Sequence, residues 1–215
     1  MVENANCLVF LELGVVPIKY EIKSRQLNFL HQILTLERDD PVRRCFGEQE
    51  RFPYEKNWVS EVRESLKVLQ LQQSDDEIAE MSKEEWKRTV KNKIREKALE
   101  ELIFEKSKLK KGAAISCSEL GMSEYFDELD ATAARIMFQI RAEVLDIKVF
   151  RQYKYDNDLC RLCGVGSENL DHIVNLCAGI PRGSDLVNVM SDDVRDMKMV
   201  VRRIQHFLDM VDANY

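Results

Sequence analysis

The sequence predicts an all-α protein, a multi-helix domain that ends in a terminal helix. Two observations lead to this fold class. The 215 residues include only eight glycines and four prolines, while helix-forming residues are plentiful. Apolar residues also recur at intervals of three and four, which is the spacing of one helix face. A third observation concerns the C-terminal region, where three of the six cysteines and one of the three histidines fall within residues 160–177. This cluster predicts a small Cys-Cys-His-Cys knuckle before the last helix.

Helices are expected over most of residues 3–81. A short apolar helix over 3–13 should close at Gly14, and a half-buried helix over 17–36 should follow, with its apolar positions from Ile18 to Leu34 facing the core. Asp40 and Pro41 suit the N-cap and first residue of a short helix that ends at the stretch with Gly47 and Pro53. Two more helices are predicted over 58–71 and 75–81.

The longest predicted helix starts at the capping box formed by Ser82 and Glu85 and ends at Lys110-Lys111-Gly112. Its apolar residues recur every fourth position and form one stripe: Trp86, Val90, Ile94, Ala98 and Leu102. A basic stripe lies about 100° around the axis: Lys83, Lys87, Lys91 and Arg95. The basic stripe has two interpretations, a solvated helix face or a contact with nucleic acid.

Two helices are predicted after the long one. The loop that joins residue 111 to the first of them is the best domain boundary. A strongly apolar helix should cover 131–150, and Asp192 and Asp193 should cap a final helix. The final helix carries a short heptad seam: Val194, Met197, Val201, Ile204, Leu208 and Val211. The seam over Val194–Val211 has two interpretations: it packs onto the chain itself, or it forms a homodimer. The expected regions are 1–115, 116–152, 153–180 for the knuckle, and 181–215.

Cys160, Cys163, His172 and Cys177 have the spacing Cys-x2-Cys-x8-His-x4-Cys, which predicts one structural zinc ion, Zn²⁺. A Cys-x2-Cys turn points two thiolates the same way, and Gly164 lets the backbone turn behind them. His172 and Cys177 should reach inward from a short helix. Four nitrogen and sulfur ligands close a tetrahedron, leaving no open position for water. The alternative is a group of ordinary buried cysteines.

Charge and termini limit the location and partners of the chain. The formal net charge of −6 argues against the broad basic field of a typical nucleic-acid binder. Residues 82–111 nevertheless hold 11 Lys and Arg against 6 Glu, a local excess of +5. No secretory signal or long apolar run is present. We therefore expect an intracellular protein, nuclear or cytoplasmic, with no membrane segment.

Rings and cations alternate just before the knuckle. Such mixtures bind single-stranded nucleic acid, because bases stack on rings while cations meet phosphates. The candidate residues in this stretch are Arg151, Tyr153, Lys154 and Tyr155, and Arg161 within the cysteine motif joins them; a brace for the metal loop is the alternative interpretation. Arg141 and Lys148 fall on an apolar helix face and need an anion, which is either a carboxylate of the fold or a phosphate.

Several strings together resemble the C-terminal, post-polymerase region of reverse transcriptases from non-LTR retrotransposons. They are residues 10–22, 25–31 and 137–141, with the cysteine motif from Leu159 to Cys177. The resemblance implies a helical thumb and connector, then a zinc knuckle that helps to hold RNA or DNA. Glu143 departs from the pattern, in which a second basic residue often stands two places after the position of Arg141.

The polymerase chemistry itself is not expected. A palm domain holds two Mg²⁺ ions on aspartates at strand ends, whereas the aspartate pairs at 39–40, 75–76 and 192–193 sit at the starts of predicted helices as caps. The expectation is a non-catalytic zinc-knuckle module that binds RNA or DNA. The rival is a structural or protein-interaction helical domain, self-associating through its last helix.

Overall fold

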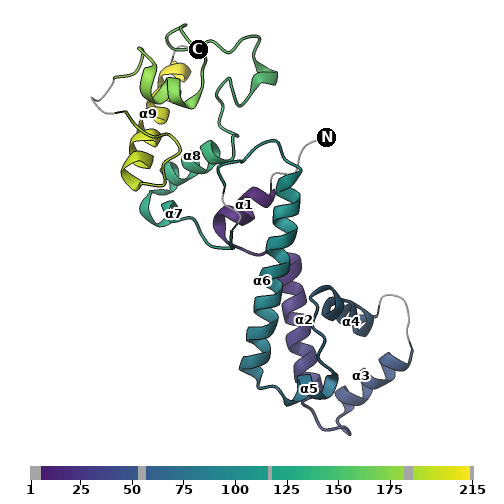
Figure 1. Cartoon of the computed structure of the whole chain (residues 1–215). Coiled ribbons are helices and arrows are strands. Elements are labelled where there is room, and N and C mark those ends of the chain that lie inside the picture. Colours follow the sequence, from purple (N-terminus) through teal and green to yellow (C-terminus); the bar gives the residue numbers. More distant parts are fainter. Residues whose placement is uncertain (1–5, 53–56, 116–117, 182–185, 214–215) are drawn as a thin grey trace. The chain divides into compact units, whose positions relative to one another are not determined.

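The computed structural model describes residues 6–52, 57–115, 118–181 and 186–213, and these residues form helices and no β-strand (Figure 1). The predicted all-α class is therefore confirmed for the described residues. The helices in chain order are α1 (Asn6–Leu13), α2 (Ile18–Leu34), α3 (Pro41–Arg51), α4 (Trp58–Val68), α5 (Asp75–Glu80), α6 (Lys83–Ser107), α7 (Tyr125–Glu128), α8 (Ala131–Arg141), the 3₁₀ turn η1 (Gln152–Lys154), the π-helical turn η2 (His172–Leu176) and α9 (Val194–Ala213).

The chain divides into two compact units, which differ from the predicted regions. The central unit is Val15–Glu105, and the terminal unit joins Met1–Gly14 to Lys106–Tyr215. The first helix belongs with the C-terminal residues because the Glu12 carboxylate accepts hydrogen bonds from Tyr125 and Arg141. The regions predicted at 116–152, 153–180 and 181–215 share one apolar core, so they are parts of a single unit.

Helix α6 anchors the central unit beside α2 (Figure 1). All five apolar residues of its predicted stripe are buried, and the Trp86 indole donates to the Leu27 carbonyl over 3.0 Å. The four residues of the basic stripe are exposed. On α2 the prediction was wrong at Ile18 and Ile22, which are 72% and 53% exposed. Tyr20 is buried instead, and its hydroxyl donates to Glu101 over 2.7 Å.

Two helices end earlier than their apolar pattern predicts. Helix α8 ends at Arg141 rather than near residue 150, because Glu143 takes a left-handed φ of +55°. Glu143 and Val144 then donate their amides to the carbonyls of Ile140 and Gln139, which is the Schellman pattern. Gln70, also at a φ of +55°, ends α4 in the same way. Residues 142–151 consequently form a turn that leads directly into the cysteine region.

The apolar face of the last helix is buried within the terminal unit. Met197, Val201, Ile204 and Val211 of the predicted seam are buried, and α9 packs on α8 and η2. The helix starts where predicted, since the Asp193 carboxylate accepts from the amides of Arg195 and Asp196. Burial of Val194–Val211 residues favours packing onto the chain itself over a homodimer at this seam. Among the described helices, none combines the length and apolar character that a membrane crossing requires.

Candidate metal centre

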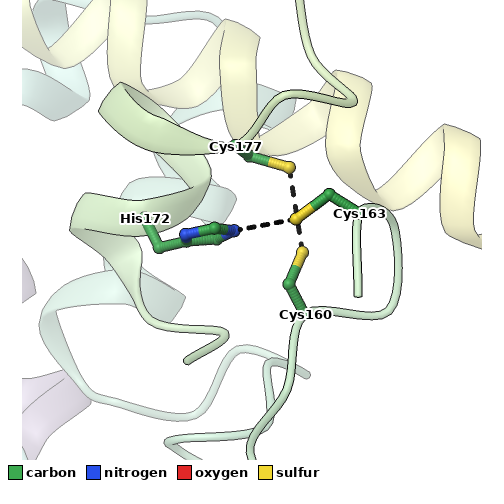
Figure 2. A group of neighbouring side chains, drawn as sticks. All are labelled: Cys160, Cys163, His172 and Cys177. Carbon is green, nitrogen blue, oxygen red and sulfur yellow. Dashed lines mark hydrogen bonds between the residues drawn. The ribbon is translucent and has the colours of Figure 1, made fainter. Parts of the chain in front are cut away.

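Cys160, Cys163, His172 and Cys177 converge in the terminal unit, as Figure 2 shows. Their ligand atoms all lie within 4.8 Å of one another. The sulfurs of Cys160 and Cys177 are 3.8 Å apart, and Cys163 Sγ lies 3.3 Å from His172 Nε2. Four ligands about 2.3 Å from a tetrahedral metal would be about 3.8 Å from one another. The group therefore has the dimensions of a four-coordinate metal site.

The first two ligands lie on a tight hairpin-like loop. Leu159 and Ser167 form an isolated antiparallel bridge, and the Cys160 amide donates to the Gly166 carbonyl over 2.9 Å. Within the loop, the Gly164 amide donates to the Cys160 carbonyl over 2.8 Å, and this hydrogen bond closes the turn between the two cysteines. The sequence predicted this turn from the Cys-x2-Cys spacing and Gly164.

The second two ligands lie on either end of the π-helical turn η2. Residues five apart on an α-helix are rotated by about 140°, which would point His172 and Cys177 away from each other. In η2 the Cys177 amide instead donates a hydrogen bond to the His172 carbonyl, five residues earlier. One wider turn thus brings both side chains to the same side. The Asn169 side chain starts the turn by accepting from the His172 amide over 2.8 Å.

Gly166 holds the loop against the histidine. Its φ is +73°, and a Cβ placed on it would lie 3.0 Å from His172 Nδ1. A side chain here would be strained by its backbone and would press on the imidazole. The glycine therefore permits the close approach of the loop to the ring and keeps Nε2 directed at the sulfurs.

The cysteine thiols differ in acidity. Burial raises the pKa of the Cys177 thiol to about 12. For Cys163, burial also opposes ionisation, but hydrogen bonds at its sulfur from the backbone of Val165 and from Cys160 outweigh it, so its pKa lies below the usual value. A cation among the sulfurs would favour the thiolate forms at all three positions.

A buried carboxylate braces the loop that carries Cys160 and Cys163. Glu168 is 0% exposed and accepts from the backbone amides of Lys148 and Arg161 over 3.0 and 2.8 Å. The Arg161 guanidinium also donates to Glu168 over 2.8 Å and lies over the Tyr155 ring, 5.1 Å from its centroid. The Tyr155 hydroxyl accepts from Arg161 over 3.0 Å. Arg161 and Tyr155 are therefore largely engaged inside the fold, as the brace interpretation expects.

The other predicted contact residues beside the loop differ in accessibility. Tyr153 is 74% exposed, and Lys154 is exposed with a 3.3 Å ion pair to Asp146. Lys148 is half-buried and donates to Asn157 over 2.9 Å. Arg151 is half-buried and donates to the Tyr153 hydroxyl and the Val144 carbonyl. Tyr153 and Lys154 thus form the accessible part of this predicted surface.

Arg141 has a carboxylate partner within the fold, the first of its two predicted alternatives. It is 9% exposed, and its guanidinium donates to Glu12, Asp192 and the Ala114 carbonyl over 2.7, 3.1 and 2.9 Å. Because the group is buried and its nitrogens are engaged, these contacts favour the carboxylate alternative over a phosphate contact. Sequence reasoning missed Glu12 and Glu168. Glu12 stands within an apolar segment, which is a signal of a buried carboxylate, whereas Glu168 stands in a polar stretch and gives no such signal.

The remaining cysteines and histidines lie apart from the group. Cys7 is buried and Cys45 is exposed, while Cys117 lies outside the described residues. His31 is buried, with its Nε2 3.0 Å from the Met81 carbonyl and its ring stacked on Trp86. His206 is exposed on α9. His31 is thus a polar residue of the central unit whose ring nitrogen has a partner.

Comparison with known proteins gives no relative for this fold or site: no family profile, no curated protein and no solved structure matches the chain. What the structure itself establishes is a helical chain with a Cys₃His group that can hold a metal ion.

Proposed function

We propose that the protein is a non-catalytic nucleic-acid-binding module built on a zinc knuckle. The observation that carries the proposal is the convergence of Cys160, Cys163, His172 and Cys177 within 4.8 Å. Three sulfurs and one imidazole nitrogen are the donors of structural zinc sites, and a complete set of four leaves no open position for catalysis. The resemblance of the sequence to the end of retrotransposon reverse transcriptases supports the same assignment.

Zinc is tested by the metal content of the purified chain. Native mass spectrometry should find one zinc ion per chain, and Cys163→Ser should lose it. Cys45→Ser is the matched control, because Cys45 is an exposed cysteine of α3. A chain that folds without metal, and whose Cys163→Ser variant is equally stable, would contradict the zinc assignment.

Nucleic-acid contact is supported by exposed residues in both units. In the terminal unit Tyr153 offers a ring for base stacking beside Lys154. In the central unit Lys87, Lys91 and Arg95 lie on the exposed side of α6. The combined replacement Tyr153→Ala with Lys154→Ala should weaken binding of single-stranded RNA about tenfold, since a stacked base contributes about 1–3 kcal/mol. Gln152→Ala, in the same 3₁₀ turn, is the control.

A protein-interaction domain is the second candidate, favoured by one apolar hollow of the terminal unit. Val9, Leu13, Phe126 and Phe138 line a hollow of about 480 Å³ beside α1 and α8. If this hollow binds a second copy, light scattering should show a mass that rises with concentration, and Val9→Asp should abolish the rise. Salt-dependent RNA binding by a strictly monomeric chain supports the lead proposal instead.

A further inference from the structure

A row of basic side chains on α9 lies outside every surface considered so far. Arg195, Lys198, Arg202 and His206 are all exposed. At 100° per residue they fall within a sector of about 80°, and at 1.5 Å per residue they extend over about 16 Å. They therefore form one straight row, called here the α9 row, along three turns of the helix.

The row borders a groove of the terminal unit. Lys198, Arg202 and His206 line a groove of about 1040 Å³, whose apolar floor includes Ile136 and Val201. In the described part of the chain, the side chains of these three residues make no ion pair or hydrogen bond. Among the described residues, Lys198 and Arg202 are cations without an internal carboxylate, so they are free to meet an external anion.

Carboxylates also line the groove and restrict where an anion can lie. Asp130 caps α8 by accepting from the backbone amides of Thr132 and Ala133, and Asp209 accepts from the side-chain Nε2 of Gln205 over 2.7 Å. Glu128 is exposed on the same rim. Asp209 lies on α9 itself, three residues after His206, so an anionic ligand would run along Lys198 and Arg202 and avoid Glu128, Asp130 and Asp209.

We propose that the α9 row binds the phosphate backbone of single-stranded nucleic acid. The proposal rests on the proposed function and identifies residues that the sequence did not suggest. Lys198, Arg202 and His206 follow one another at four-residue steps, each about 6 Å along the axis. A nucleic-acid backbone presents regularly repeated charges whatever its sequence, which suits such a regular row better than the irregular charges of an acidic peptide.

The row is mechanically linked to the metal group. Arg203, on the neighbouring face of α9, donates to the Val174 carbonyl over 2.8 Å. Val174 lies in η2, between His172 and Cys177. Because the metal ligands fix the two ends of this turn, they also fix the part of the chain on which α9 rests.

The test uses the full chain with zinc bound and a labelled single-stranded RNA in fluorescence anisotropy. Lys198→Gln with Arg202→Gln should weaken binding roughly tenfold at moderate salt and lower the salt slope by about 1.4, since each phosphate contact contributes about 0.7. Arg44→Gln with Arg135→Gln removes the same charge from exposed positions outside the groove and should leave affinity within about twofold. Glu128→Gln should tighten binding.

Each outcome decides a different point. If the unaltered chain does not bind RNA, the proposed function fails and this inference fails with it. If the chain binds, and Tyr153→Ala with Lys154→Ala weakens binding while Lys198→Gln with Arg202→Gln does not, only the α9 row is refuted. If polyglutamate displaces the RNA at equal ionic strength and the row variant abolishes polyglutamate binding, the occupant is an acidic peptide and the nucleic-acid assignment is overturned.

Discussion

Replacement of Glu168 tests whether the brace behind the cysteine loop stabilises the terminal unit. The Glu168 carboxylate is fully buried and receives two backbone amides, those of Lys148 and Arg161, besides the Arg161 guanidinium. Glu168→Ala removes all of these acceptors at once. Glu168→Gln keeps one acceptor oxygen but removes the charge that neutralises Arg161.

The magnitude follows from what each variant leaves unpaired. Each buried amide without an acceptor costs about 1–3 kcal/mol, and a buried cation that loses its carboxylate costs about 3–5 kcal/mol. Arg161 keeps the Tyr155 hydroxyl and the Asp146 carbonyl, which reduces the second cost. We expect Glu168→Ala to lower the free energy of unfolding by about 3–5 kcal/mol and Glu168→Gln by about 1–2 kcal/mol.

Urea unfolding of the zinc-loaded chain, followed by circular dichroism, measures both values. Asp156→Ala is the control, because Asp156 is an exposed carboxylate near the same loop. It should change the free energy of unfolding by less than about 0.5 kcal/mol. A loss below about 1 kcal/mol for Glu168→Ala would refute the reasoning, since the loop would then be held without the buried carboxylate.

Three further predictions concern other parts of the chain. Glu143→Gly should stabilise the chain by about 0.5–1 kcal/mol in urea unfolding, because glycine relieves the left-handed backbone that ends α8. Gly166→Ala should weaken zinc affinity at least tenfold in a chelator competition, because its Cβ would lie 3.0 Å from His172 Nδ1. Trp86→Phe should cost about 1–2 kcal/mol in thermal unfolding, because it removes the hydrogen bond to the Leu27 carbonyl. In each case, an unchanged stability or zinc affinity would contradict the contact or backbone conformation on which the prediction rests.

The sequence predicted those features that depend on local patterns. The four-residue spacing from Trp86 to Leu102 places one face of α6 in the core, and all five residues are buried. Asp40 accepts from the Val42 amide and starts α3, as its cap chemistry predicts. Local signals of this kind need no knowledge of distant residues.

Helix ends without glycine could not be predicted in this way. Schellman ends usually carry glycine at the left-handed position, and the chain places Gln70 and Glu143 there instead. The apolar pattern continues past both positions, so it predicts helices that are too long. At Glu143 the turn is supported from residue 111, since the Lys111 ammonium donates to the carbonyls of Glu143 and Phe150 over 3.3 and 2.9 Å. Such support comes from a distant part of the chain, so the local sequence around Glu143 gives no signal of it.

The candidate metal group shows the same division between local and distant causes. Spacing alone predicted the four residues of the group, but a His-x4-Cys pair on an α-helix would diverge by about 140°. In the structure these residues form a π-turn instead, and the Asn169 side chain starts it by accepting from the His172 amide. Within the turn, the Asn175 side chain donates to the Val187 carbonyl and accepts from the Val187 amide. Because Arg203 of α9 also donates into this turn, the wider turn is held from outside the motif. The geometry of the ligands is therefore a property of the whole terminal unit, and a peptide limited to residues 160–177 should bind metal more weakly than the full chain.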